Sequence, residues 1–310
     1  MQEEQAVIPG IDPKIDYAFK RLFGREQNRP LLIHLLNAVL QPPPEAPISS
    51  VEILNPFNDK EALDDKLSVV DIKARDQLGR QFDVEMQMVA DQYFRGRAVY
   101  YWAKFHQQQL HEGQGYPDLH PTILICFVNS VLYQGEDRYH LRFQLRDETN
   151  TLLFSDHLAI HLLELPKYRR SAQEVVGPLD QWLYFLCHAA DMDRMRLPAP
   201  LQVPEICRAM EDLEMISRND LERERYEARV KLERDERSRL VAAKEKGLEE
   251  GLGKGLEKGL EKGLKLGLVD QIHLYQRLLK CERTPAQDLL AMSLAELRKL
   301  AAELDASLPQ

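Results

Sequence analysis

The stretch VVDIKARDQLGRQFDVEMQM, residues 69–88, decides the fold, because it predicts a β-hairpin that sets two acids opposite each other. Successive side chains of a strand point to opposite faces. Gly79 can provide the positive φ that closes a three-residue hairpin loop. Pairing the two strands about Leu78 places Asp71 opposite Glu85, with Cβ atoms about 4.5–5.5 Å apart.

Two carboxylates this close repel each other unless another group compensates their charge. A divalent cation is the simplest compensation, because oxygen ligands on adjacent strands can chelate it. The same register places Lys73 opposite Asp83, where the two can form a salt bridge. The alternative for the whole set is a solvated polar face of an antiparallel sheet.

An Asp on one strand and Glu-x-Gln on the next resembles the core of PD-(D/E)XK nucleases. More narrowly, it resembles the Rpn-type recombination-promoting nucleases, also called PD-(D/E)XK family transposases. The resemblance covers roughly residues 10–170, and its flanking motifs are the opening helix 12–23 with the pattern D-x-x-F-K-x-x-F, the approach 65–73 to the first acid, and the helix 93–110.

The resemblance implies a DNA endonuclease that depends on Mg²⁺ or Mn²⁺. Asp71 and Glu85 would hold the ion, with the backbone carbonyl of Met86 as a further ligand. Gln87 stands where the wider superfamily has Lys, and would orient the attacking water. Lys73, on the same face, would supply the missing cation.

Three residues are secondary candidates by motif position alone: Asp16, Lys20 and Asp65. Of these, Lys20 is an alternative to Lys73 for stabilising the attacked phosphate. The competing hypothesis is not enzymatic: an inactive nuclease fold would serve as an oligomeric interaction protein. The intact acidic set argues against decay, whereas the formal net charge of −9 fits a DNA-binding protein poorly.

Composition predicts a cytoplasmic protein with no membrane partner. The 310-residue chain is 44% hydrophobic, has no run of 18 apolar residues, and begins with an acidic stretch that does not resemble a secretory signal. The four cysteines form no CxxC pair, so they are expected to be reduced thiols. Two basic clusters are either DNA contacts or ordinary surface charge: Lys14, Lys20, Arg21, Arg25 and Arg29 near the first helix, and Arg95, Arg97 and Lys104 on the later one.

The expected fold is α/β, a restriction-endonuclease-like mixed sheet flanked by helices. Helical periodicity covers 13–40, with a new helix beginning at Pro30, and recurs at about 92–111. The second of these helices would be the crossover that a parallel neighbour requires. Besides the hairpin, strands are expected at 51–54, 122–128, 141–145 and 158–165.

Four segments are expected: the nuclease-like core 1–170, a helical extension 171–217 that packs on it, a long helix 218–268, and a helical hairpin 269–310 with a capping box at Ser293. Within the third, Gly recurs every four residues from 247 to 267, and Leu follows each. A helix-interior Gly costs about 1 kcal/mol relative to Ala, so this ridge predicts close packing against a partner helix. Homodimerisation or higher homo-oligomerisation would follow; the alternative is a flexible linker.

Overall fold

The structure is a computed structural model that describes residues 9–55 and 71–308. The chain divides into two compact units, residues 1–235 and residues 236–310. None of the helices in the described ranges combines the length and the apolar character that a membrane span needs.

The first unit is built on a mixed sheet, for which the described residues provide six strands in the order β1-β2-β3-β4-β6-β5. The strands are β1 (Val51–Ile53), β2 (Asp71–Asp76), β3 (Gln81–Gln87), β4 (Thr122–Val128), β5 (His140–Arg146) and β6 (Leu153–Glu164). β1, β2 and β3 pair antiparallel, β3, β4 and β6 run parallel, and β5 pairs antiparallel with β6. The expected α/β fold with a mixed sheet is confirmed.

The β2–β3 hairpin has the register that its sequence predicts. Asp71 pairs with Glu85 and Lys73 pairs with Asp83. Gly79 has φ +79°, the left-handed conformation expected at the loop. The carboxylate of Asp76 accepts hydrogen bonds from the backbone N–H groups of the loop, each at 2.9 Å, which holds the turn in place.

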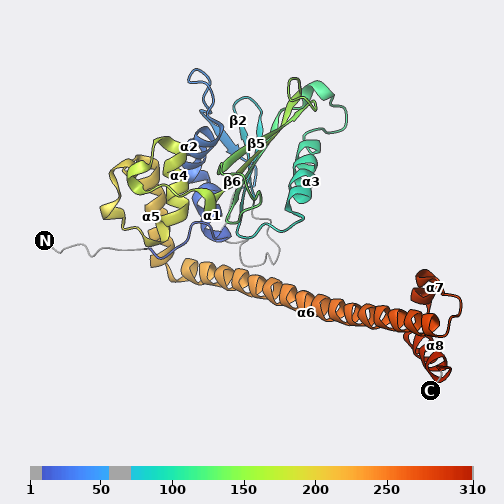
Figure 1. Ribbon diagram of the computed structural model, residues 1–310. Helices are drawn as coiled ribbons and strands as arrows, with labels where there is room; N and C mark the ends of the chain where they lie inside the picture. Colours follow the sequence, from blue (N-terminus) through green and yellow to red (C-terminus); the bar gives the residue numbers. More distant parts are fainter. Residues whose placement is uncertain (1–8, 56–70, 309–310) are drawn as a thin grey trace. The chain divides into compact units, whose positions relative to one another are not determined.

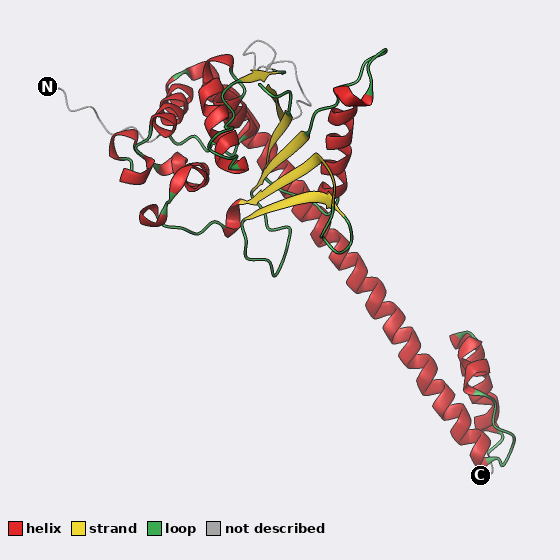
Figure 2. Ribbon diagram, turned by 90° about the horizontal axis from the view of Figure 1, so that it is seen from above, coloured by secondary structure: helices red, strands yellow, loops and turns green. Residues whose placement is uncertain are grey.

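Helices cover both faces of the sheet (Figures 1 and 2). One face packs against α1 (Asp16–Phe23), α2 (Arg29–Leu40), α4 (Gly177–His188) and α5 (Pro204–Arg218) around the larger core cluster. The opposite face packs against α3 (Phe94–Gln107), which is the crossover between the parallel strands β3 and β4, as expected. All seven residues of β4 are buried, which fits its continuous apolar sequence.

The helical extension after the sheet packs on the core, as expected. Trp182 of α4 is fully buried, lies edge-on to Phe23, and donates a hydrogen bond from Nε1 to Nδ1 of His34 at 2.9 Å. Ile206 and Leu213 of α5 are fully buried in the same cluster.

Helix α6 runs from Asp220 to Leu278 and contains the glycine repeat, so the repeat is helix rather than linker. Residue 268, where this helix was expected to end, lies inside it. The first turns of α6 belong to the first unit and hold α1. Glu222 lies 2.6 Å from the buried guanidinium of Arg21, and the hydroxyl of Tyr226 accepts the backbone N–H of Asp12 at 2.9 Å.

The second unit ends in a small helical core. The last turns of α6 pack with α7 (Ala286–Ala291) and α8 (Leu294–Ala306) around Ile272 and Leu297. The expected capping box is present, because Ser293 accepts the N–H of Glu296 and the Glu296 carboxylate accepts the N–H of Ser293.

Candidate active site

The candidate site lies on the sheet face that α3 covers. Glu85 is 6% exposed on β3, directly opposite Asp71 on β2. The structure places Asp71 on β2, in register with Glu85 on β3. Local hairpin pairing alone therefore sets these two positions opposite each other.

Two neighbours make this face more acidic and more buried than the sequence indicates. Asp83, two residues before Glu85 on β3, is 2% exposed. Cys126 of β4 is in register with Glu85 and is fully buried. Burial raises the pKa of the Cys126 thiol well above its ordinary value, and the charges of Glu85 and Asp83 raise it further. The thiol stays neutral, so it adds no further negative charge beside the carboxylates.

The backbone of β3 also fits a metal ligand set. Carbonyls of successive strand residues point to alternate neighbours. The carbonyl of Gln87 accepts the N–H of Asn129, at 2.8 Å, on the β4 side. The carbonyl of Met86 therefore points towards β2, the strand of Asp71. Among the side chains that the structure describes, no group of three or more His, Cys, Asp and Glu is arranged to hold a metal.

Lys73 and Gln87 lie on the same face as Glu85. Lys73 is opposite Asp83 in register, and its Nζ lies 5.1 Å from the ring centroid of Phe105 on α3. Gln87 is half-buried, two residues beyond Glu85 on β3. Lys73 is placed either to pair with Asp83 or to face a phosphate at the carboxylates.

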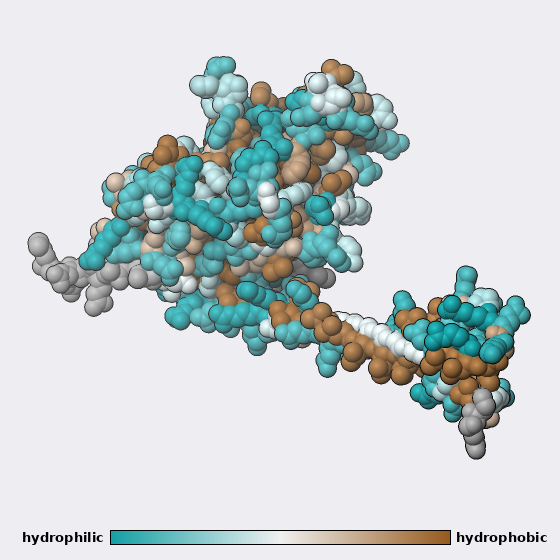
Figure 3. Space-filling view, in the orientation of Figure 1, coloured by the Kyte–Doolittle hydropathy of each residue, from teal (hydrophilic) through white to brown (hydrophobic). Residues whose placement is uncertain are grey.

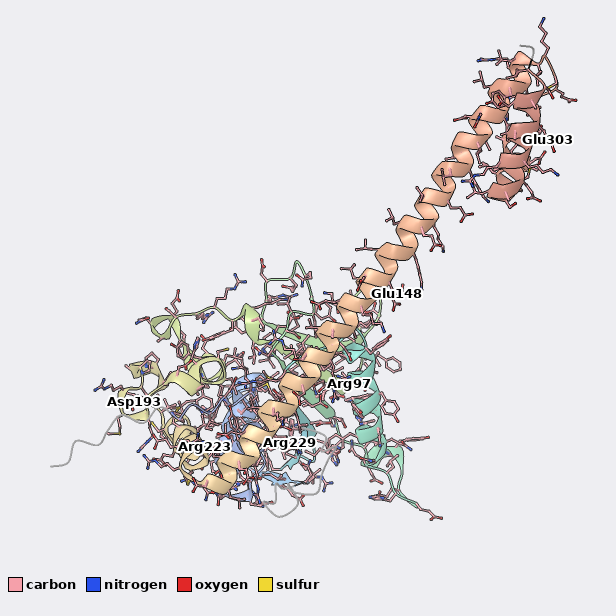
Figure 4. All side chains as sticks on the ribbon, turned by 90° about the horizontal axis from the view of Figure 1, so that it is seen from below. Arg97, Glu148, Asp193, Arg223, Arg229 and Glu303 are labelled. Atoms are coloured by element: carbon pink, nitrogen blue, oxygen red, sulfur yellow. The ribbon has the colours of Figure 1, made fainter. Side chains whose placement is uncertain are left out.

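The secondary candidates from the opening helix lie on α1, which packs on the other face of the sheet. Asp16 Oδ2 lies 3.6 Å from Nε of Arg229 on α6, and its Oδ1 accepts the N–H of Tyr17. Arg229 is labelled on α6 in Figure 4. Lys20 is half-buried one turn further along α1. Asp65 lies outside the described residues. The contacts of Asp16 give it a structural role in holding α6.

The basic cluster near α1 is largely neutralised by ion pairs. Arg21, which is 3% exposed, and Arg25 both pair with Glu222, at 2.6 and 3.6 Å. Lys14 pairs with Asp12 at 2.8 Å, and Arg29 pairs with a Glu one turn away. For these four residues the structure favours a structural role over DNA contact.

A mixed sheet with helices on both faces, and with facing acids in its antiparallel hairpin, is the arrangement of a PD-(D/E)XK fold. The PD-(D/E)XK nuclease family transposases match residues 13–243, which is most of the chain. The chain belongs to this family, as the sequence resemblance indicates. Comparison with curated proteins gave no match, and comparison with solved structures gave none either.

Proposed function

We propose that this protein is a metal-dependent DNA endonuclease of the recombination-promoting type, acting in the cytoplasm on phosphodiester bonds. The observation that carries the proposal is the register of Asp71 with Glu85, together with the Met86 carbonyl that points towards β2, the strand of Asp71. Membership of a nuclease family supports it.

Asp71 and Glu85 are the proposed ligands of Mg²⁺ or Mn²⁺, together with the carbonyl of Met86. These are hard oxygen donors, which both ions prefer. A divalent ion bound there supplies Lewis-acid polarisation of the phosphate and a water of lowered pKa. Gln87 is proposed to orient the attacking water by hydrogen bonding. Lys73 is proposed to stabilise the charge that develops on the phosphate.

Plasmid cleavage tests this proposal. Wild-type protein should nick or linearise supercoiled DNA with Mg²⁺ or Mn²⁺, but not with EDTA, and Ca²⁺ should support cleavage poorly. Asp71→Ala and Glu85→Gln should abolish cleavage. Glu52→Gln is a matched control, because Glu52 is an exposed acid on the neighbouring strand β1. This variant should cleave DNA normally. Full cleavage by Asp71→Ala would remove the catalytic assignment.

We further propose that the protein forms a parallel homodimer through α6. An added Cβ at any glycine of the repeat would meet nothing within 4 Å, so the chain itself makes no use of their smallness. Five of the six leucines that follow are exposed, from 43% at Leu264 to 78% at Leu256, and Leu268 is half-buried against the small helical core. Figure 3 shows both features as adjacent rows along the helix, one near-neutral and one hydrophobic.

In the middle of the ridge, the charges beside these rows favour the parallel orientation. In two of the six repeats an acid lies two residues after Gly and a base three residues after it: Glu257 and Lys258 after Gly255, and Glu261 and Lys262 after Gly259. At about 100° per residue, the bases of these two repeats flank Gly and the acids flank Leu. A twofold axis along the helices sets each basic flank against the partner's acidic flank, whereas an antiparallel pair sets like charges together.

The competing function, an inactive nuclease fold that acts only as an oligomeric interaction protein, is favoured by the same exposed rows. It predicts the dimer without cleavage. Plasmid cleavage and sedimentation of the same wild-type sample therefore separate the two functions, because only the endonuclease hypothesis predicts metal-dependent product.

A further inference from the structure

Helix α3 presents two different flanks to the sheet below it. Phe94, Ala98 and Phe105 are its buried residues. Trp102 donates a hydrogen bond from Nε1 to the carbonyl of Thr122 at 2.9 Å, so its flank lies over β4. The other flank therefore faces the β2–β3 hairpin.

The contacts of α3 fix this orientation independently. On the flank of Trp102, the ring of His106 lies 5.5 Å from that of His157, which belongs to β6. Phe105 lies at the buried centre of the helix, and its ring centroid is 5.1 Å from Nζ of Lys73, which belongs to β2. The helix thus spans the sheet from β6 towards the candidate active site.

At about 100° per residue, one set of side chains falls on the hairpin flank. These residues form what we term the α3 ledge: Tyr93, Arg97, Tyr100, Tyr101 and Lys104. Tyr93 and Tyr100 are 70% and 63% exposed, and the rings of Tyr100 and Tyr101 lie 5.6 Å apart. Figure 4 labels Arg97 on this helix.

The charge of α3 is unlike that of the rest of the chain. Phe94–Gln107 contains Arg95, Arg97 and Lys104 but no Asp or Glu, although the chain as a whole has a formal net charge of −9. Arg97 pairs with Asp91 at 3.4 Å, and the two side chains are 36% and 43% exposed. A pair this exposed contributes little and is easily exchanged for a phosphate.

We propose that the α3 ledge is the surface on which the DNA backbone lies, so that the next phosphates along the strand reach Asp71 and Glu85. This inference rests on the proposed endonuclease function. Arginine and lysine neutralise phosphates, and tyrosine hydroxyls donate to phosphate oxygens. The ledge carries both types beside the acids. Such contacts position DNA without reading its sequence.

The test is the salt dependence of duplex binding in the Glu85→Gln protein, which should bind without cutting. Fluorescence anisotropy with a labelled 30-base-pair duplex gives Kd at several salt concentrations in EDTA. Changing Arg97 and Lys104 together to Gln should make the negative slope of log K against log[salt] less steep by about 2, because two phosphate contacts are lost. Kd should rise roughly 10- to 60-fold at 0.1 M salt.

Arg95→Gln is the matched control, because Arg95 lies on the other flank, with its guanidinium carbon 5.8 Å from the ring centroid of Tyr133. It should leave Kd and the slope nearly unchanged. An unchanged slope in the double variant would overturn the ledge, as would an equal loss in the Arg95 control.

Cleavage by the wild-type protein keeps the two proposals separate. If it cuts DNA while the double variant binds normally, the ledge is wrong and the endonuclease function stands. If it binds duplex through the ledge but never cuts, the ledge stands and the endonuclease function fails. If it neither binds nor cuts, both proposals fail.

Discussion

Replacing ridge glycines of α6 should stabilise the helix and weaken the dimer at the same time. The change is Gly251, Gly255 and Gly259 to Leu. All three are inside α6, and an added Cβ meets nothing within 4 Å at any of them. Each replacement should therefore add about 0.8 kcal/mol to helix stability, and the three together about 2–3 kcal/mol.

The opposite effect is expected on association. Close approach of two helix backbones needs a smooth glycine surface, and three leucine side chains would hold the axes apart. The dissociation constant of the dimer should rise at least about tenfold, which corresponds to about 1.4 kcal/mol. Sedimentation equilibrium of the full-length protein measures this constant. Hydrogen exchange of the amides in 247–267 measures the helix-opening free energy in the same protein.

Gly253→Leu provides the matched control. Gly253 lies two residues after Gly251, outside the four-residue ridge, and is equally unobstructed. It should slow local amide exchange by the amount of a single replacement and leave the dimer constant unchanged. The reasoning would be refuted if the triple variant dimerised as tightly as the wild type, or if Gly253→Leu weakened the dimer just as much.

The remaining predictions concern the first unit. Gln87→Lys should retain single-turnover cleavage, whereas Gln87→Leu should lose at least about tenfold; a wild-type rate for the Leu variant would leave Gln87 as a bystander. Burial, then a neighbouring histidine, lowers the pKa of His161 to about 3, so the folded state resists protonation. The free energy of unfolding is therefore at its full value above about pH 6.5 and falls as the pH drops towards 3. At pH 5 it is reduced by about 2 kcal/mol. His161→Gln should therefore flatten the fall in melting temperature between pH 7 and 5, and the exposed His111→Gln should not; equal slopes in the two variants would contradict this. Glu222→Ala should leave the buried Arg21 guanidinium without its closest carboxylate and cost about 3 kcal/mol in urea unfolding; a loss below about 1 kcal/mol would show that the ion pair is unimportant.

The hairpin and its acids could be predicted from sequence because the information is local. The turn at Gly79 and the two-residue alternation fix the register, and with it the pairing of Asp71 with Glu85. The crossover helix and the buried strand β4 follow from apolar periodicity and length in the same way.

What sequence could not give depends on contacts between distant segments. The burial of Asp83 and the approach of Cys126 to Glu85 arise from the parallel pairing of β3 with β4, whose register has no local signal. The pairing of Asp16 with Arg229 depends on how α6 packs against α1. The hairpin-facing flank of α3 likewise depends on the hydrogen bond from Trp102 to Thr122 of β4, a contact between separate elements.

The most direct test of the central claim is a crystal structure of the protein soaked in Mn²⁺, with data collected at a wavelength where manganese scatters anomalously. The proposal predicts one strong anomalous peak between the carboxylates of Asp71 and Glu85, about 2.1–2.3 Å from an oxygen of each, and its loss in Glu85→Gln. An anomalous peak elsewhere in the Mn²⁺-soaked crystal, with none between these two carboxylates, would contradict a metal-dependent site on the β2–β3 hairpin.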